Sequence, residues 1–171
     1  MIHLYYGDGK GKTTSAIGLC IRACGAGKRV IFLQFMKGNE TSELAAMKQL
    51  SGIRILRSAK DYGFYKQMTE EEKQALKMEH DKNLLLAREA VCQGQCNLLV
   101  LDEVTYAFLW ELVDRTVLMD FLRDYGDKTE IVLTGRNPDK FFLEQADYIT
   151  NMKCERHPFE RGIPARKGIE Y

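Results

Sequence analysis

The chain has 171 residues, of which 45% are hydrophobic and 29% charged, and its formal net charge is +1. This length suits one globular domain, over residues 1–171, with a core of its own. The small net charge excludes the strongly basic field that attracts nucleic acids. No apolar run approaches the ~20 residues of a membrane span, and no secretory segment precedes the first motif. We therefore expect a cytoplasmic protein without a nucleic-acid or membrane partner.

The first predicted element is a short apolar strand, Ile2–Tyr6, which runs into the glycine-rich loop at residues 7–14. A helical pattern follows and ends near Gly25 or Gly27. A loop of this kind between a strand and a helix presents backbone N–H groups to an anion. The usual pattern, G-x-x-x-x-G-K-[ST], would place its first glycine where this chain has Tyr6. The spacing is therefore one residue short.

The loop carries candidate ligands for a polyphosphate. The Lys12 ammonium would lie against the phosphates, and the Thr13 hydroxyl is a natural ligand for Mg²⁺. The alternative is a Gly-Lys turn without a ligand, which the flanking strand and helix make the weaker interpretation. The candidate ATP-binding residues of the loop are Gly7, Asp8, Gly9, Lys10, Gly11, Lys12, Thr13 and Thr14.

Strands and helices alternate along the rest of the chain. The predicted strands cover residues 29–35, 53–56, 97–103, 130–136 and 148–152. Thr69 followed by Glu72 is a capping-box signature at the start of the longest helix. The predicted helices cover residues 42–49, 69–91, 106–125 with a break near Asp114, and 139–146. This alternation predicts an α/β fold: a doubly wound, mostly parallel sheet with helices on both faces.

Polar residues follow several of these strands, and ligands of such sheets bind beyond the strands' carboxyl ends. Asp102 and Glu103 end an apolar run, where carboxylates hold a metal ion, unless the pair merely caps a helix. Arg136 would bind a polyphosphate through its guanidinium, unless it is an ordinary surface arginine. We expect these three residues, the glycine-rich loop and Lys37 to gather at one edge of the sheet.

Other features leave alternatives open. Phe64, in an aromatic loop at residues 59–68, either packs into the core or forms a wall against a large planar ligand. Trp110 belongs to the core or to a subunit interface. The basic tail at residues 156–171 is either solvated or folded onto the body. The five cysteines form no C-x-x-C pair and, with three histidines, no usual zinc signature. We expect reduced, mostly buried thiols.

Six segments together resemble one known family: GDGKGKTTSA, FLQFMKG, YGF, NLLVLDEV, VLTGRN and RHPFERGIPARKGIEY. They are similar, in order and spacing, to the P-loop type ATP:corrinoid adenosyltransferases, which act on cob(I)alamin or cob(I)yrinic acid a,c-diamide. The resemblance implies a RecA-like fold and a homodimer. It implies transfer of the 5′-deoxyadenosyl group of ATP to cobalt(I) of a reduced corrinoid, with release of triphosphate. In this family the short-spaced loop is the norm and holds the polyphosphate in a reversed orientation.

The resemblance also implies roles for single residues. Lys12 and Arg136 would act in catalysis by stabilising the departing triphosphate, and Phe64 by excluding the lower axial ligand of the corrinoid. Further residues near ATP would be Arg22 and Lys37. The corrinoid-binding residues would be Phe64, Tyr65 and His157. The metal ligands would be Thr13, Asp102 and Glu103.

The chain departs from the family pattern at two positions. Asp8 stands where the family often has asparagine, and Lys66 stands where the motif G-F-T-W has tryptophan. A flavoprotein-type electron donor is the expected partner. Two other functions remain possible from the residues: a nucleoside kinase-like phosphotransferase with Glu103 as the base, and an ATP-binding module without catalysis.

Overall fold

The computed structural model describes residues 1–170, so that Tyr171, the last residue of the tail motif, lies outside the described residues. At its centre is a six-stranded sheet with the order β3-β2-β4-β5-β1-β6. All five strand pairings are parallel. The strands are β1 (Ile2–Tyr6), β2 (Val30–Gln34), β3 (Ile53–Arg57), β4 (Leu98–Asp102), β5 (Glu130–Gly135) and β6 (Tyr148–Asn151). The predicted α/β class and parallel sheet are confirmed.

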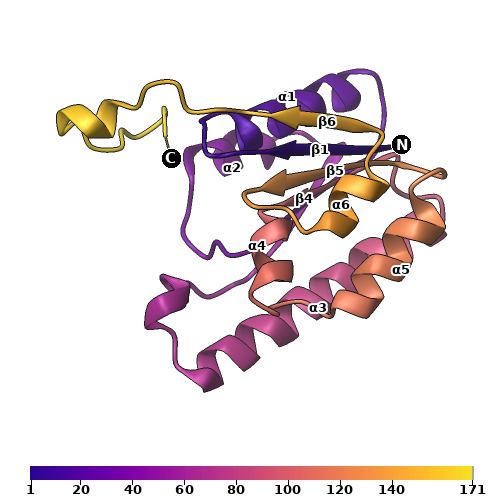
Figure 1. Cartoon of the computed structure of the whole chain (residues 1–171). Helices are drawn as coiled ribbons and strands as arrows, with labels where there is room; N and C mark the ends of the chain where they lie inside the picture. Colours follow the sequence, from indigo (N-terminus) through magenta and orange to yellow (C-terminus); the bar gives the residue numbers. More distant parts are fainter. Residues whose placement is uncertain (171) are drawn as a thin grey trace.

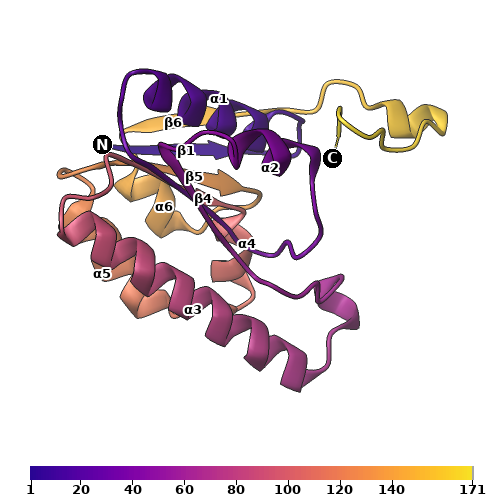
Figure 2. The ribbon, with the colours of Figure 1, turned by 180° about the vertical axis from the view of Figure 1, so that it is seen from behind.

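Helices cover both faces of the sheet (Figure 1; Figure 2 from behind). One face carries α1 (Lys12–Gly25) and α2 (Ser42–Met47). The other face carries α3 (Glu70–Cys92), α4 (Val104–Leu109), α5 (Arg115–Tyr125) and α6 (Lys140–Gln145). Two short 3-10 turns complete the chain, η1 (Tyr65–Gln67) in the aromatic loop and η2 (Pro158–Arg161) in the tail.

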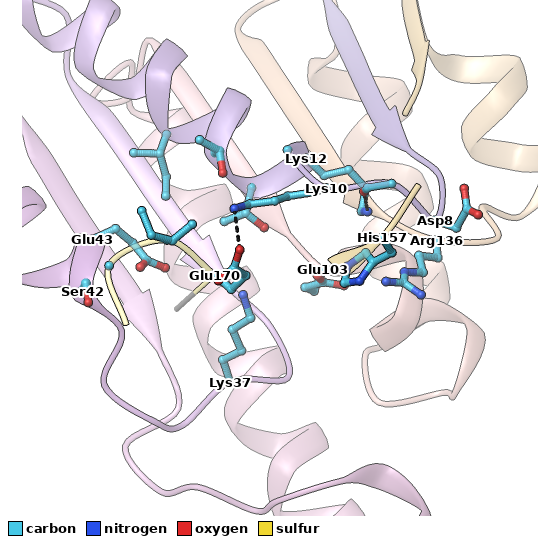
Figure 3. A pocket seen from close by; sticks show the side chains of 17 residues that line it. Asp8, Lys10, Lys12, Lys37, Ser42, Glu43, Glu103, Arg136, His157 and Glu170 are labelled. Carbon is cyan, nitrogen blue, oxygen red and sulfur yellow. Dashed lines mark hydrogen bonds and ion pairs between the residues drawn. The ribbon is translucent and has the colours of Figure 1, made fainter. Parts of the chain in front are cut away.

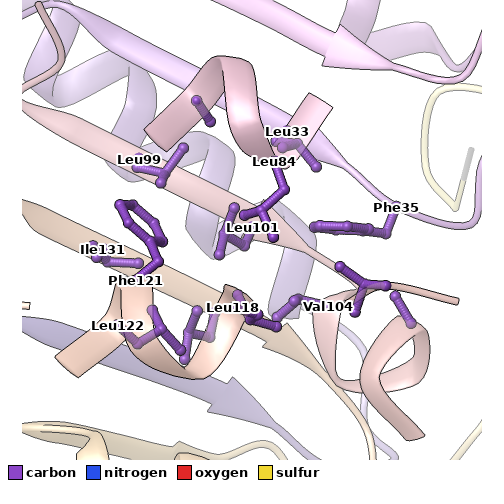
Figure 4. Close-up of a cluster of buried hydrophobic side chains, with 14 of the residues drawn as sticks. Leu33, Phe35, Leu84, Leu99, Leu101, Val104, Leu118, Phe121, Leu122 and Ile131 are labelled. Carbon is purple, nitrogen blue, oxygen red and sulfur yellow. The ribbon is translucent and has the colours of Figure 1, made fainter. Parts of the chain in front are cut away.

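The core lies in two layers because side chains of a strand alternate between the faces of the sheet. In β4, which is buried throughout, Leu99 and Leu101 pack with Phe121 of α5 (Figure 4). Leu98 and Val100 point to the opposite layer, against α1. A strand buried on both faces is apolar at every position up to its polar carboxyl end, as the sequence of β4 is.

Helix ends follow local sequence signals. The predicted capping box opens α3: Glu72 N–H donates to Thr69 Oγ1 at 3.3 Å, and Thr69 N–H donates to Glu72 Oε2 at 3.0 Å. The single helix expected over residues 106–125 is two helices, and Asp114 caps the second by accepting from Val117 N–H at 3.0 Å. Among residues 1–170, no helix combines the length and apolarity needed to cross a membrane.

The cysteine prediction was wrong in one respect. Cys20 and Cys96 are buried, and burial raises the pKa of their thiols to about 12 and about 11. Cys24 and Cys154 are half-buried, and Cys92 is exposed. The thiols are therefore not mostly buried, because Cys92 ends α3 on the solvent side and Cys154 lies in the segment after β6.

Candidate active site

A cavity of about 570 Å³ lies beyond the carboxyl end of the sheet, above the loop that joins β1 to α1 (Figure 3). Its walls include Lys37 after β2, Glu103 after β4 and Arg136 after β5. The start of α2 and the end of the tail complete it. Parallel strands end at the same edge, so these strand exits meet although they are far apart in the sequence.

Most of the glycine-rich loop faces this cavity. The loop residues that line it are Asp8, Gly9, Lys10, Gly11, Lys12, Thr13 and Thr14. Gly7 does not line it and faces a neighbouring hollow beside Asn137 and Asn151. The structure thus brings seven of the eight predicted loop residues to one site.

The short loop is pressed against the segment that leaves β6. Gly9 N–H donates to Met152 O at 2.7 Å. A Cβ at Gly9 would lie 2.6 Å from that oxygen and 2.7 Å from Lys153 O, closer than any side chain tolerates. Cys154 N–H donates to Asp8 Oδ1 at 3.2 Å. The glycine is therefore needed for close backbone approach, and residues 152–154 support the loop, which the sequence motif alone did not indicate.

Lys12 begins α1 and is almost fully buried, at 7% exposure. Its Nζ donates to Gly9 O at 2.7 Å, which holds the ammonium over the loop. Burial lowers the pKa of Lys12, and the nearby Arg136 guanidinium lowers it further, while Glu103 and other carboxylates oppose this change. A poorly solvated cation of this kind is strongly stabilised by an anion placed against it.

Asp102 is the centre of a buried hydrogen-bond network. Its Oδ1 accepts from the Thr13 hydroxyl at 2.8 Å and from the Thr134 hydroxyl at 2.7 Å. Its Oδ2 accepts from Gln34 Nε2 at 3.2 Å and lies 3.8 Å from Lys37 Nζ. The network joins α1 to the ends of β2, β4 and β5. The sequence places Thr134 among the polar strand ends expected at this edge, whereas Gln34, also a polar residue at the end of an apolar strand, was not predicted.

Glu103 occupies the N-cap position of α4 but makes no side-chain cap bond, so the capping alternative for this residue is wrong. Its backbone is left-handed, with φ 61°, and its N–H donates to Thr134 Oγ1 at 2.9 Å. Its Oε2 is buried without a hydrogen-bond partner among the described residues. Burial and the adjacent Asp102 raise the pKa of Glu103, and Lys37 is the largest opposing influence.

These oxygens fit a magnesium ion. Within residues 1–170, no group of three or more His, Cys, Asp or Glu side chains is placed to hold a metal by itself. Mg²⁺ is commonly held by one or two carboxylates together with substrate phosphates and water. The unpartnered Glu103 oxygen, the Asp102 carboxylate and the Thr13 hydroxyl provide that kind of incomplete ligand set beside the loop.

Arg136 is exposed, lines the cavity and forms no ion pair with the described residues. It follows Gly135, whose φ of 147° is unfavourable for other residues. A Cβ at Gly135 would lie 1.9 Å from Thr105 Oγ1, which donates to Arg136 O at 2.8 Å. Thr105 and the glycine therefore fix the backbone from which the guanidinium extends.

Besides Gly7 and the fully buried Asp102, three predicted residues do not line this cavity: Arg22, Phe64 and Tyr65. Arg22 lies in the last turn of α1 and lines a separate cavity of about 370 Å³, with His3. Phe64 is 79% exposed, so its core-packing interpretation is wrong. Tyr65 stacks on Trp110, with ring centroids 4.5 Å apart, and Trp110 also stacks on Tyr106.

The tail turns back to the glycine-rich loop. Glu170 accepts from Lys10 Nζ at 3.1 Å and pairs with Arg166 at 3.0 Å. Arg166 is the main reason why the pKa of Glu170 falls to about 2. His157 lines the cavity near Glu103 and Arg136 (Figure 3). The tail is largely exposed, as a solvated tail would be. Its end nevertheless lines the cavity, as expected of a tail folded onto the body.

A family model described as "ATP:corrinoid adenosyltransferase BtuR/CobO/CobP" matches residues 1–171. The chain belongs to this family. It is 28% identical to the corrinoid adenosyltransferase of Escherichia coli K12 over 173 residues, which cover 100% of this chain and 85% of that protein. It is also 28% identical to the corrinoid adenosyltransferase CobA of Salmonella typhimurium, with the same coverage. Identity to the Pseudomonas aeruginosa corrinoid adenosyltransferase is 27%, over 98% of this chain and 82% of that protein.

The fold of this adenosyltransferase chain also matches a solved structure, the KaiC-like protein PH0186 of Pyrococcus horikoshii OT3. The TM-score is 0.57 at 17% sequence identity, over 89% of this chain and 70% of that one. At this identity the likeness concerns the fold alone. It agrees with the RecA-like P-loop architecture that the resemblance implied.

Proposed function

We propose that the chain transfers the 5′-deoxyadenosyl group of ATP to cobalt(I) of a reduced corrinoid and releases triphosphate. The observation that carries this proposal is the cavity that Lys12, Lys37 and Arg136 line together with the glycine-rich loop. Three cations and a set of backbone N–H groups suit a triphosphate. Membership in the ATP:corrinoid adenosyltransferase family supports the corrinoid as the acceptor.

The reaction requires little chemistry from side chains. Cobalt(I) supplies the electron pair that forms the Co–C5′ bond, and cobalt becomes formally cobalt(III). The C5′–O5′ bond breaks, and its electron pair leaves with the triphosphate. Because the metal is the nucleophile, no residue needs to act as nucleophile or general base. The protein contributes positioning of the ribose carbon and stabilisation of the leaving group.

The charges at the loop suit this leaving group. Lys12 is poised over the loop by its bond to Gly9 O, and Arg136 projects from a backbone fixed by Thr105. Both would bind triphosphate oxygens as their negative charge increases. We place the ribose carbon away from the deepest part of the loop, so that the carbon rather than a phosphorus atom faces the corrinoid.

A magnesium ion would supply further positive charge to the triphosphate. Thr13, Asp102 and Glu103 would hold it, with phosphate oxygens completing the coordination. Asp102 is already oriented by Thr134 and Gln34, so the ion would not need to reorganise this carboxylate. The unpartnered oxygen of Glu103 would be one of the ligands that hold the ion.

We place the corrinoid against the aromatic loop and His157. The exposed ring of Phe64 is available to cover the lower face of a planar ligand. With Lys66 in the place of the family tryptophan, the stack of Tyr65 on Trp110 supplies the neighbouring aromatic surface. We further propose a cytoplasmic homodimer that receives electrons from a flavoprotein-type donor.

The test is incubation of the protein with Mg-ATP and chemically reduced cobalamin. The proposal predicts the visible spectrum of adenosylcobalamin together with free triphosphate. Formation of ADP with a phosphorylated acceptor would identify a phosphotransferase instead. Tight ATP binding without any product would identify a binding module.

A further inference from the structure

One buried histidine outside the cavity connects two segments that lie far apart in the sequence. His80 of α3 is only 1% exposed. Its Nε2 accepts from Met36 N–H at 3.2 Å, and its Nδ1 lies 2.8 Å from Leu112 O. A carbonyl oxygen can only accept, so Nδ1 carries the proton and Nε2 is the free acceptor. The imidazole is therefore neutral, with both nitrogens bonded.

The partner of His80 is an unusual turn. Met36 follows the end of β2 with a left-handed backbone, φ 62°, which residues with a side chain rarely adopt without support. The hydrogen bond from Met36 N–H to the imidazole supplies such support. On the other side of the turn, Phe35 N–H donates to Asp102 O at 2.9 Å, and the Phe35 ring meets the imidazole edge-on.

The next residue after this turn is Lys37. Its side chain lines the cavity, and its Nζ lies 3.8 Å from Asp102 Oδ2. The direction in which the lysine leaves the sheet depends on the conformation of Met36, because the backbone of one residue sets the path of the next. A change at Met36 therefore moves the ammonium relative to Asp102.

We propose that His80 is a positioning residue for the ATP site: by accepting the Met36 N–H, it fixes the turn that directs Lys37 at Asp102 and the triphosphate. His80 itself touches neither ATP nor the corrinoid. The inference rests on the proposed function only in taking Lys37 as a ligand of ATP. It also explains why a histidine is buried here, since an apolar residue would leave the Met36 N–H without an acceptor.

The environment keeps the imidazole in the accepting form. Burial lowers the pKa of His80 to about 4, although the hydrogen bond to Leu112 O and the nearby Asp81 and Glu79 oppose this change. The positive charge of Lys77, one turn earlier on α3, lowers the pKa of His80 further. The ring therefore stays neutral, and able to accept, at neutral pH.

Two substitutions separate the two hydrogen bonds. In His80→Gln, the amide oxygen and nitrogen are joined through one carbon, as the two ring nitrogens are, so both bonds can form. In His80→Asn, the shorter side chain retains the bond to Leu112 O and does not reach Met36. We expect the dissociation constant of Mg-ATP, measured by titration calorimetry without corrinoid, to stay near wild type in the glutamine variant. In the asparagine variant it should rise about tenfold, as expected for one charge-assisted contact.

The decisive comparison is a double-mutant cycle with Lys37→Met. If His80 acts through Lys37, His80→Asn adds no further loss of Mg-ATP affinity in the Lys37→Met background. Losses that multiply, or full affinity in folded His80→Asn, overturn the proposal. Leu84→Ala in the same helix is the control: it removes core packing and leaves the imidazole and both of its hydrogen-bond partners in place, so it should lower the melting temperature and leave Mg-ATP affinity unchanged.

Two further outcomes keep this test independent of protein folding and of the proposed function. If His80→Asn does not fold, His80→Leu replaces it, because leucine fills the space and offers no acceptor. The same tenfold loss is expected, and full affinity in the folded leucine variant again overturns the proposal. A wild-type protein that binds Mg-ATP without adenosylating a corrinoid would contradict the proposed function and leave the positioning test intact.

Discussion

The Thr13 hydroxyl donates to Asp102 Oδ1 at 2.8 Å and so joins the first turn of α1 to the end of β4, across 89 residues of sequence. This bond brings the two metal-ligating candidates of the site into contact. We predict that Thr13→Val, which keeps the shape and removes the hydroxyl, lowers kcat/KM by roughly 10- to 100-fold, or about 1.4–3 kcal/mol. The matched control is Thr13→Ser, which keeps the hydroxyl. Equal activity in the valine and serine variants, assayed over a range of Mg²⁺ concentrations, would exclude this role.

Gly135→Ala tests how the Arg136 backbone is fixed. The new Cβ would lie 1.9 Å from Thr105 Oγ1, at a φ of 147°. We expect the free energy of unfolding to fall by about 1–3 kcal/mol, because the backbone strain and the steric clash with Thr105 both destabilise the folded state. Activity should fall as well, since the Thr105 bond to Arg136 O cannot persist. Denaturant unfolding and kcat measure the two effects.

Gly18→Ala is the matched control for this substitution. Gly18 is exposed within α1, and a Cβ there would meet nothing within 4 Å. Alanine should therefore raise the free energy of unfolding by about 0.5–1 kcal/mol through helix propensity. If Gly135→Ala, like Gly18→Ala, did not lower the free energy of unfolding, Thr105 would not pack closely against β5.

His80 predicts a pH dependence of stability. Its pKa of about 4 in the folded protein lies below the ordinary value of 6.5. The unfolded chain therefore binds a proton in the window between these values that the folded protein does not bind. The free energy of unfolding should fall as the pH drops from about 6.5 towards 4, by roughly 3 kcal/mol from this group. Urea titrations at several pH values should show this component in wild type and its loss in His80→Gln.

Phe64→Ala separates the corrinoid-facing role from stability. With the ring 79% exposed, we expect the free energy of unfolding to change by less than about 0.5 kcal/mol. Activity should be lost mainly when reduction starts from cobalt(II) under a mild reductant, and should be retained with chemically formed cobalt(I). Equal activity of the variant and wild type under the mild reductant would contradict the lower-face role.

The sequence predicted the strands well because each buried parallel strand is apolar on both faces up to a polar exit. It did not predict which of the polar side chains at the strand ends contact one another. Gln34 and Thr134 reach Asp102 only because β2 and β5 flank β4, and this strand order is a property of the whole sheet. Local sequence likewise could not place Trp110 against Tyr65, since that stack joins the aromatic loop to the end of α4.

Arg22 matches a family position near ATP, but the structure does not bring it to the cavity above the glycine-rich loop. It stands ten residues after Lys12 on one continuous helix, and an α-helix rises 1.5 Å per residue, so about 15 Å separates the two positions along the axis. The structure accordingly places Arg22 in the last turn of α1, beside the separate cavity with His3. The role of Arg22 near ATP therefore stays a prediction, and the structure shows only that Arg22 does not line the cavity above the loop.

The most direct test of the account is the stoichiometry of one turnover in wild type and Lys12→Ala. With Mg-ATP and chemically reduced cobalamin, we predict one triphosphate for each adenosylcobalamin formed. In Lys12→Ala, which removes the ammonium held over the loop, kcat should fall by roughly 10²–10³-fold. Undiminished cobalt alkylation in Lys12→Ala, or ADP or free phosphate in place of triphosphate, would contradict the central claim that this loop holds the leaving triphosphate.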